Sequence, residues 1–219
     1  MKRGFAGFIA LVLLLGAVSA FGEETEVTLH AGVKLGMGIR EVVQAETDAG
    51  NTVYNASPNA KGVRVSPEEA ESVSLPWGML YYYGKVAGGD ADSHANYSFN
   101  EDRVLTKVQY FIRSSKKERK KLYDQIEDTL AKKYGKPGAS AATRTKLVSD
   151  GELSKVASYV DIRRIADYSQ WIVEQPDGTR ILIEHIFQDS STNGEYNFMN
   201  YVIIDSDSDS GSSSLEDDL

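Results

Sequence analysis

The chain contains three histidines, His30, His94 and His185, which stand in separate segments. Asp90, Asp92 and His94 alternate along a short turn-forming stretch, so their side chains could face one cation. Zinc and other transition metals usually need three or four protein ligands. Because this stretch offers three ligands at most, we expect a solvated turn and no bound metal.

Motifs for nucleophilic catalysis and for nucleotide binding are missing from the sequence. Gly-x-Ser-x-Gly does not occur, and no Ser-His-Asp arrangement can be placed from residue spacing. Gly36-Met37-Gly38 lacks the third glycine of a dinucleotide-binding loop. No pair of acids stands out as general acid and base. We therefore expect no enzymatic activity and no cofactor, with a hydrolase whose site cannot be recognised in the sequence as an alternative.

Residues 205–219 hold six acids and no base. Asp205, Asp207, Asp209 and Glu216 match positions 1, 3, 5 and 12 of a calcium-binding loop. The glycine that such a loop needs at position 6 stands at position 7, and no helix follows. Because the segment has almost no apolar residue to bury, we expect a disordered acidic tail. Weak attraction of calcium by charge density stays open.

A basic run occupies residues 116–121 at the start of a predicted helix. Lys116, Lys117 and Lys120 belong to it, and positive charge at a helix N-terminus opposes the helix dipole. One interpretation is a solvated helix face. The other is a patch for an anionic lipid, a cell-wall polymer or an acidic partner.

Aromatic residues are densest at Trp77, Tyr81, Tyr82 and Tyr83. On a strand, Tyr81 and Tyr83 share one face and Tyr82 takes the other. One face is therefore core, and the other could be an exposed aromatic surface of the kind enriched at interfaces. Core packing or a second covered sheet face is the alternative.

Overall composition suits an ordinary globular protein of one domain or two small ones. The 219 residues are 41% hydrophobic and carry a net charge of −8, which argues against a nucleic-acid partner. Cysteine is absent. Disulfides, thiol catalysis, cysteine metal sites and lipid attachment through an N-terminal cysteine are thereby excluded.

The N-terminus has the three parts of a secretory signal peptide. Lys2 and Arg3 precede an apolar run, 5–18, and a small-residue cleavage site, 18–20. We expect a signal peptide of residues 1–20 and a mature chain that starts at Phe21 or two residues later, with an uncleaved anchor as an alternative. The apolar run is short for a membrane-spanning helix, which needs about 20 residues. The protein is therefore expected to be secreted or periplasmic and not membrane-spanning after cleavage.

Two short segments carry helical signals. Ile39, Val42 and Val43 fall on one face of a helix predicted over 39–46. Ser66, Pro67 and Glu69 have the types of a helix start, followed by one or two turns before Pro76.

The strongest helical prediction covers residues 115–134. Ser115 and Glu118 match a capping box, and Gly135 followed by Pro137 ends the helix. Its apolar stripe comprises Leu122, Ile126, Leu130 and Tyr134. A helix with one apolar stripe must bury it, and a sheet face is the natural partner.

Alternation of apolar and polar residues predicts the strands. They are expected at 27–33, 77–86, 95–99, 104–112, 168–175, 179–188 and 198–204. Within 104–112 the alternating residues are Val104, Thr106, Val108, Tyr110 and Ile112. Pro176-Asp177-Gly178 predicts a tight hairpin.

This element order predicts an α+β fold in which an antiparallel sheet has helices packed on one face. The domain is expected to cover residues 23–204. It can be divided into two α-then-β units, 33–113 and 114–204.

Two stretches resemble known exported domains. Leu35-Gly36-Met37-Gly38-Ile39-Arg40-Glu41-Val42 is similar to the opening of small envelope domains. Residues 97–110, with the helix end at 130–137, complete a resemblance to β-lactamase-inhibitor-protein-like and BamE/SmpA-like domains over about half the chain. The resemblance implies helices on an antiparallel sheet and action by protein contact. Gly38 replaces the usual Ser or Thr cap, and the lipoprotein cysteine of BamE-like proteins is missing.

Taken together, these observations predict an exported, non-enzymatic binding or interaction protein. Its partner is expected to be another protein or a component of the cell envelope. The candidate interaction surface comprises Trp77, Tyr81, Tyr83, Lys116, Lys117 and Lys120. One alternative is an inhibitor that blocks an enzyme by inserting a loop, either 48–64 or 138–154. A flat sheet face would favour the first hypothesis, and a long protruding loop would favour the second.

Overall fold

The computed structural model describes residues 26–56, 62–75, 78–138, 165–188 and 196–204. The predicted signal peptide, the acidic tail, Trp77 and nearly all of the predicted loop 138–154 lie outside these residues. The helical elements are η1 (His30–Gly32), α1 (Ile39–Asp48) and α2 (Arg119–Tyr134). The strands are β1 (Val53–Tyr54), β2 (Arg64–Val65), β3 (Met79–Tyr83), β4 (His94–Phe99), β5 (Leu105–Arg113), β6 (Ile165–Glu174), β7 (Arg180–Gln188) and β8 (Tyr196–Ile204).

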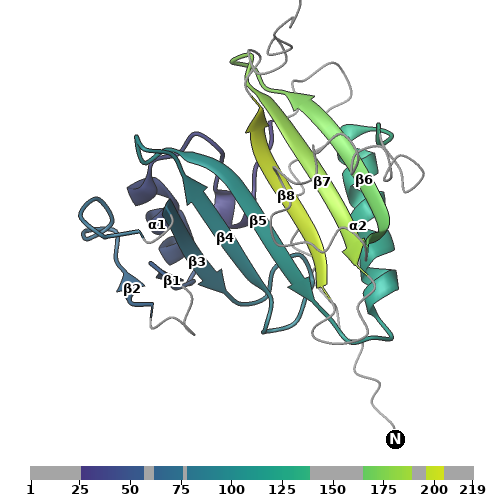
Figure 1. Ribbon diagram of the computed structural model, residues 1–219, viewed down its shortest axis with the longest axis horizontal. Coiled ribbons are helices and arrows are strands. Elements are labelled where there is room, and N and C mark those ends of the chain that lie inside the picture. Colours follow the sequence, from purple (N-terminus) through teal and green to yellow (C-terminus); the bar gives the residue numbers. More distant parts are fainter. Residues whose placement is uncertain (1–25, 57–61, 76–77, 139–164, 189–195, 205–219) are drawn as a thin grey trace, which may run out of the picture.

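All eight described strands belong to one antiparallel sheet in the order β2-β1-β3-β4-β5-β8-β7-β6. Both helices lie on the same side of this sheet (Figure 1). The predicted α+β fold, with helices packed on one face of an antiparallel sheet, is therefore confirmed. Within the part of the chain that the structure describes, no helix is both long and apolar enough to cross a membrane.

The strand order is symmetric about the pair formed by β5 and β8. On one side of this pair the sheet continues with β4 and β3, and on the other side with β7 and β6. Each set of three strands follows one helix in the chain. We call α1 with β3–β5 the first unit and α2 with β6–β8 the second unit.

Helix α1 forms where the apolar spacing predicts it. Ile39, Val42 and Val43 are completely buried against the sheet. At the helix start, the Glu41 carboxylate accepts the Gly38 backbone N–H at 2.7 Å, which satisfies a donor that the helix itself cannot. Gly38 has no side chain to cap the helix, and the Glu41 side chain, three residues later, bonds the backbone at the cap position instead.

Helix α2 has the predicted apolar stripe and the predicted end. Leu122, Ile126 and Leu130 are buried. Gly135 ends the helix with a φ of 83° and a ψ of −170°, a backbone conformation that is essentially confined to glycine, and its carbonyl accepts the Trp171 indole N–H at 2.8 Å. The start differs from the prediction: Ser115 does bond Glu118 at 2.9 Å, but this contact closes a turn and the helix begins at Arg119.

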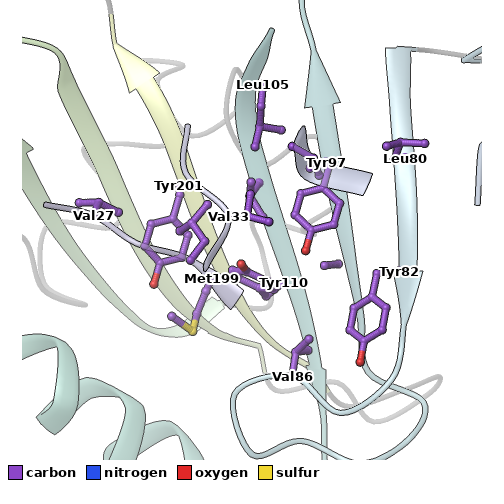
Figure 2. Close-up of a cluster of buried hydrophobic side chains, with 14 of the residues drawn as sticks. Val27, Val33, Leu80, Tyr82, Val86, Tyr97, Leu105, Tyr110, Met199 and Tyr201 are labelled. Carbon is purple, nitrogen blue, oxygen red and sulfur yellow. The ribbon is translucent and has the colours of Figure 1, made fainter. Parts of the chain in front are cut away.

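The core fills the layer between the sheet and the helices (Figure 2). Side chains from the segment before α1 enter it, including Val27 and Val33 beside Tyr110 and Tyr201. This segment packs across both units, because the Val27 N–H bonds the Gln175 side chain at 2.9 Å. Its apolar residues therefore help to join the two units.

The strand predicted at 27–33 is wrong. The segment instead contains the η1 turn, in which Ala31 has a φ of 56°. The Leu29 N–H bonds the Val33 carbonyl at 2.7 Å, and the His30 N–H bonds the Tyr110 hydroxyl at 3.0 Å. Local and side-chain hydrogen bonds thus replace a strand ladder, although the apolar side chains are buried as expected.

The alternation predicted for 104–112 is wrong at its start. Ser98 pairs with Lys107, but Phe99 pairs with Leu105, so Thr106 is an extra residue in β5. Such a bulge moves each residue that precedes it on the strand to the opposite face of the sheet from the one that simple alternation predicts. Leu105 therefore reaches the core in place of Thr106 and is completely buried.

The helix predicted after Ser66 is also wrong. The Ser66 side chain bonds Glu69 at 3.2 Å, yet only turns follow. The Arg103 guanidinium bonds the carbonyls of Ala70 at 2.7 Å and Val73 at 3.2 Å. A side chain from the β4–β5 turn thus bonds carbonyls of this segment. The residue types at 66–69 could not reveal this contact with a distant part of the chain.

Gly135→Ala should lower the free energy of unfolding by about 1–3 kcal/mol, because a residue with a Cβ is strained at this combination of φ and ψ. An added Cβ would meet nothing within 4 Å, so conformational strain is the whole effect. Gly38→Ser is the matched control, because Gly38 has a φ of −69° that serine can adopt without strain. This variant should raise the free energy of unfolding by a few tenths of a kcal/mol through better capping. Urea denaturation of both variants checks this, and equal stabilities would contradict it.

Candidate functional site

The sheet face turned away from both helices is the first candidate site, and we call it the helix-free face. Residues directly opposite one another on neighbouring strands form continuous rungs across it. One rung, the amide rung, carries polar side chains on six strands: Tyr81, Asn96, Gln109, Asn200, Glu184 and Gln170. The neighbouring aromatic rung comprises Tyr83, His94, Phe111, Phe198, Ile186 and Tyr168.

Hydrogen bonds link the second half of the amide rung. The Gln109 side-chain amide donates to Asn200 Oδ1 at 3.1 Å, and Asn200 Nδ2 donates to the Glu184 carboxylate at 3.0 Å. The Tyr168 hydroxyl donates to the other Glu184 oxygen at 2.7 Å. Glu184 is 2% exposed, and burial raises the pKa of its carboxyl more than these hydrogen bonds and nearby Lys107 lower it.

The first half of the aromatic rung is a stack of three rings, which we call the ring stack: Tyr83, His94 and Phe111. The His94 ring lies 5.1 Å from Tyr83 and 4.3 Å from Phe111, in both cases nearly parallel. All three side chains are half-buried. Phe198 meets Phe111 edge-on at 5.3 Å and is buried. The rung thus changes from partly exposed rings on β3–β5 to buried side chains on β8.

The structure places the predicted aromatic residues as strand geometry requires. Tyr81 and Tyr83 share the helix-free face, and Tyr82 enters the core on the other. Tyr81 is only 8% exposed, so it adds little surface, whereas Tyr83 belongs to the ring stack. Trp77 lies outside the described residues.

The predicted lysines do not join these aromatic residues. Lys116, Lys117 and Lys120 are exposed, and Lys120 lies on α2, on the opposite side of the sheet from Tyr83. Lys120 bonds Asp124 at 2.6 Å and approaches Asp167 at 3.4 Å. The bond to Asp124 is the main cause of the raised pKa of Lys120. The two halves of the predicted interaction surface are therefore separate.

The turn that could have held a metal is arranged otherwise. The Asp92 carboxylate pairs with Arg113, and Asp90 accepts the Asp92 backbone N–H at 2.9 Å. His94 points onto the helix-free face between two rings. Within the described ranges, no group of three or more His, Asp or Glu side chains could hold a metal ion.

A buried acid on the helix side of the sheet was not predicted from the sequence. Glu46 of α1 is completely buried, accepts the Tyr97 hydroxyl in a short hydrogen bond and accepts the Asn51 amide at 2.6 Å. His30 lies 3.9 Å from Glu46 and stacks on Tyr82 at 5.3 Å. Only the i+3 spacing of Glu46 from Val43 on the apolar face of α1 could have indicated its burial.

Burial dominates the electrostatics of this cluster. It raises the pKa of Glu46 more than the hydrogen bonds from Tyr97 and Asn51 lower it, and it lowers the pKa of His30. An acid and a histidine with shifted pKa values can serve in proton transfer. Here the Glu46 oxygens are already occupied by internal donors and the residue has no exposed surface, so the cluster suits a structural role.

A second missed cluster joins α2 to β6 and β7. The Glu127 carboxylate accepts the Ser169 hydroxyl in a short hydrogen bond and lies 3.0 Å from His185 Nδ1. His185 is completely buried and stacks on Tyr123 at 4.0 Å. These residue types are those of a catalytic triad, which residue spacing did not predict. Here, however, the Glu127 carboxylate bonds both the Ser169 hydroxyl and His185, and that hydroxyl does not bond His185. Because a triad needs histidine between the serine and the acid, this arrangement cannot activate Ser169.

A small apolar pocket lies between α2 and the segment before α1. It measures about 50 Å³, and its lining includes Thr28, Leu130, Lys133 and Tyr201. Small-molecule sites usually measure about 300–1,000 Å³. This pocket is therefore too small for a ligand of that class.

Comparison with known proteins adds little to this geometry. No family model matches the sequence, and no curated protein matches it. A crystal structure of a DUF4309 family protein (YjgB) from Bacillus subtilis is similar at 10% sequence identity. The match covers 60% of this chain and 68% of that chain, with a TM-score of 0.29.

Glu46→Gln should remove a pH dependence from folding stability. Because the pKa of Glu46 is raised in the folded protein, its ionised form costs stability at neutral pH, and this cost disappears as pH falls. From about pH 7 to about pH 5, the wild type should gain stability relative to the Gln variant. Urea denaturation across this range checks it, with exposed Glu71→Gln as control. An unchanged difference between wild type and Glu46→Gln would contradict it.

Asn200→Asp should destabilise the protein by about 2 kcal/mol or more, because it replaces a donor with a second buried acid beside Glu184. Asn100→Asp is the matched control, since Asn100 is exposed and its side-chain oxygen accepts the Val104 N–H at 2.9 Å, as an aspartate could. Thermal unfolding measures both. If Asn200→Asp destabilised the protein no more than Asn100→Asp does, the amide rung would be shown to tolerate a second carboxylate.

Proposed function

We propose that this is an exported, non-enzymatic binding protein that contacts another protein through the ring stack on its helix-free face. The observation that carries the proposal is the stack itself: three parallel rings, half-buried, on three adjacent strands. Aromatic residues are enriched at protein interfaces and often supply most of the binding energy.

The stack is held in place before any partner arrives. Tyr83, His94 and Phe111 are direct cross-strand neighbours in the β3–β4–β5 ladder. Phe198 on β8 supports Phe111 from the side. Because their positions are fixed by the ladder, binding would cost little side-chain entropy.

The chemistry around the stack favours an apolar contact. The nearest charges on the turn before β4 and at the end of β5, Asp92 and Arg113, neutralise each other in an ion pair. Buried Tyr81 stands beside Tyr83 on the neighbouring rung. We therefore commit to a protein partner that presents an apolar or aromatic side chain to the rings.

The polar clusters support a role without catalysis. Glu46 is enclosed by its own hydrogen-bond donors, and the order of Ser169, Glu127 and His185 is unsuited to a nucleophile. Export is supported by the N-terminal sequence pattern, which favours a secreted or periplasmic location.

The test is affinity capture from an envelope extract with the chain from Phe21 onward. Three proteins are compared: the wild type, a Tyr83→Ala/Phe111→Ala double variant, and Ile172→Ala. Ile172 is 52% exposed on the same face but lies on edge strand β6, so it is a matched control. Mass spectrometry identifies what each protein retains.

A partner retained by the wild type and by Ile172→Ala, and reduced at least tenfold with the double variant, is the expected result. Circular dichroism must show that the double variant is folded. Equal retention by all three proteins would show that the ring stack does not bind the partner. Turnover in a broad hydrolase screen would instead favour an enzyme.

A further inference from the structure

The two units place different side chains at one equivalent position. A two-fold axis through the Gln109–Asn200 pair exchanges β5 with β8 and β4 with β7. It relates Val108 to Met199, and these residues pair with Tyr97 and His185 respectively. Tyr97 of the first unit and His185 of the second unit are therefore equivalent.

Both residues bond a glutamate of their own helix. Tyr97 donates to Glu46 of α1, and His185 bonds Glu127 of α2 at 3.0 Å. Each unit thus has a hydrogen bond that fastens its helix to its central strand, and we call these bonds the helix latches. The first latch uses a phenol and the second an imidazole.

In the second latch, a second proton on the His185 imidazole would have no hydrogen-bond acceptor in the described part of the chain. Its Nδ1 faces Glu127, while Nε2 is buried and has no hydrogen-bond partner among the residues that the structure describes. One ring face is covered by Tyr123 at 4.0 Å. A proton on Nε2 would therefore be a buried donor without an acceptor, which is costly.

The groups facing His185 do not remove this cost. On α2 they are Glu127, Tyr123, Asp124 and Lys120. On β6, Ser169 is the cross-strand neighbour of His185, and Asp167 interacts with Tyr123. Glu127 favours the protonated form, but burial outweighs it and lowers the pKa of His185. Burial also opposes ionisation of Glu127, yet bonds from His185 and Ser169 lower the pKa of that carboxyl overall. Glu127 therefore stays charged in weak acid.

The first latch lacks this weakness. The Tyr97 hydroxyl keeps its proton, because burial raises its pKa well above the usual value. His30 is the titrating neighbour of Glu46, but its side chain is 30% exposed and lies 3.9 Å from that acid. A protonated His30 would keep partial access to water and a carboxylate 3.9 Å from its Nε2, which also lies 3.1 Å from the Asn51 amide nitrogen.

We propose that mild acid selectively loosens the second unit, by protonating His185 when α2 lifts from β6–β8, while α1 stays docked. The docked form excludes the proton and the open form accepts it, so acid shifts the equilibrium toward the open form. With an open-state histidine of ordinary pKa, opening should increase up to about tenfold between about pH 7.5 and about pH 5.5.

Hydrogen–deuterium exchange of the chain from Phe21 onward, corrected for intrinsic exchange rates, measures this directly. Amides of α2 should lose up to about tenfold in protection between those two pH values. Amides of α1 should lose no protection, because protonation of buried Glu46 favours the docked helix. Unchanged or higher protection of α2 in acid would overturn the proposal. So would an equal loss in both helices.

Variants separate the latch from general acid effects. His185→Phe keeps a ring against Tyr123 without a titrating group, and it should abolish the acid response of α2. His94→Phe, on the helix-free face, should leave the response intact. If His185→Phe does not fold, Tyr97→His supplies the second test, because it should make α1 acid-sensitive. A persisting response in folded His185→Phe, or an indifferent α1 in folded Tyr97→His, would count against the latch.

Discussion

The backbone ladder between β5 and β8 is the interaction on which the rest of the structure depends. It pairs Lys107–Arg113 with Val202–Tyr196 and joins the strands of the two units into one sheet. The same pairing continues the amide and aromatic rungs across the middle of the sheet. On the helix side it brings Tyr110 and Tyr201 into an edge-on contact at 5.9 Å. Without it there would be neither a common core nor a continuous helix-free face.

Buried polar groups lie on both sides of this sheet, and they are arranged differently. On the helix side, buried Glu46 and partly buried Glu127 each hold a helix to a strand. On the helix-free face, Glu184 is linked to amide side chains along one rung. Buried carboxylates are costly unless donors surround them, so each site fixes the position of its neighbours. Such groups favour one register over others at some cost in stability.

Local patterns predicted much of the fold. The apolar spacing of Ile39, Val42 and Val43 placed α1, and the turn at Pro176-Asp177-Gly178 placed the β6–β7 hairpin. The predictions failed where a distant group decided the outcome. The bulge at Thr106 depends on the facing strand β4, and the turns after Ser66 are bonded by Arg103 from another segment.

The candidate site was predicted less well than the fold, because rungs and clusters depend on strand register. Tyr83 was identified from its spacing, but its neighbours His94 and Phe111 come from two other strands. The contacts of Glu127 with His185 and Ser169 join three elements. No spacing rule within one segment can predict such contacts.

The β5–β8 pair has a further consequence for how the chain must fold. During synthesis, β5 appears with β4 already beside it, but its other edge has no strand until α2, β6, β7 and β8 have also emerged. An unpaired strand edge flanked by apolar side chains is an aggregation hazard. The chain should therefore be most prone to aggregation before β8 arrives, and chains truncated before β8 should aggregate more readily than the full chain.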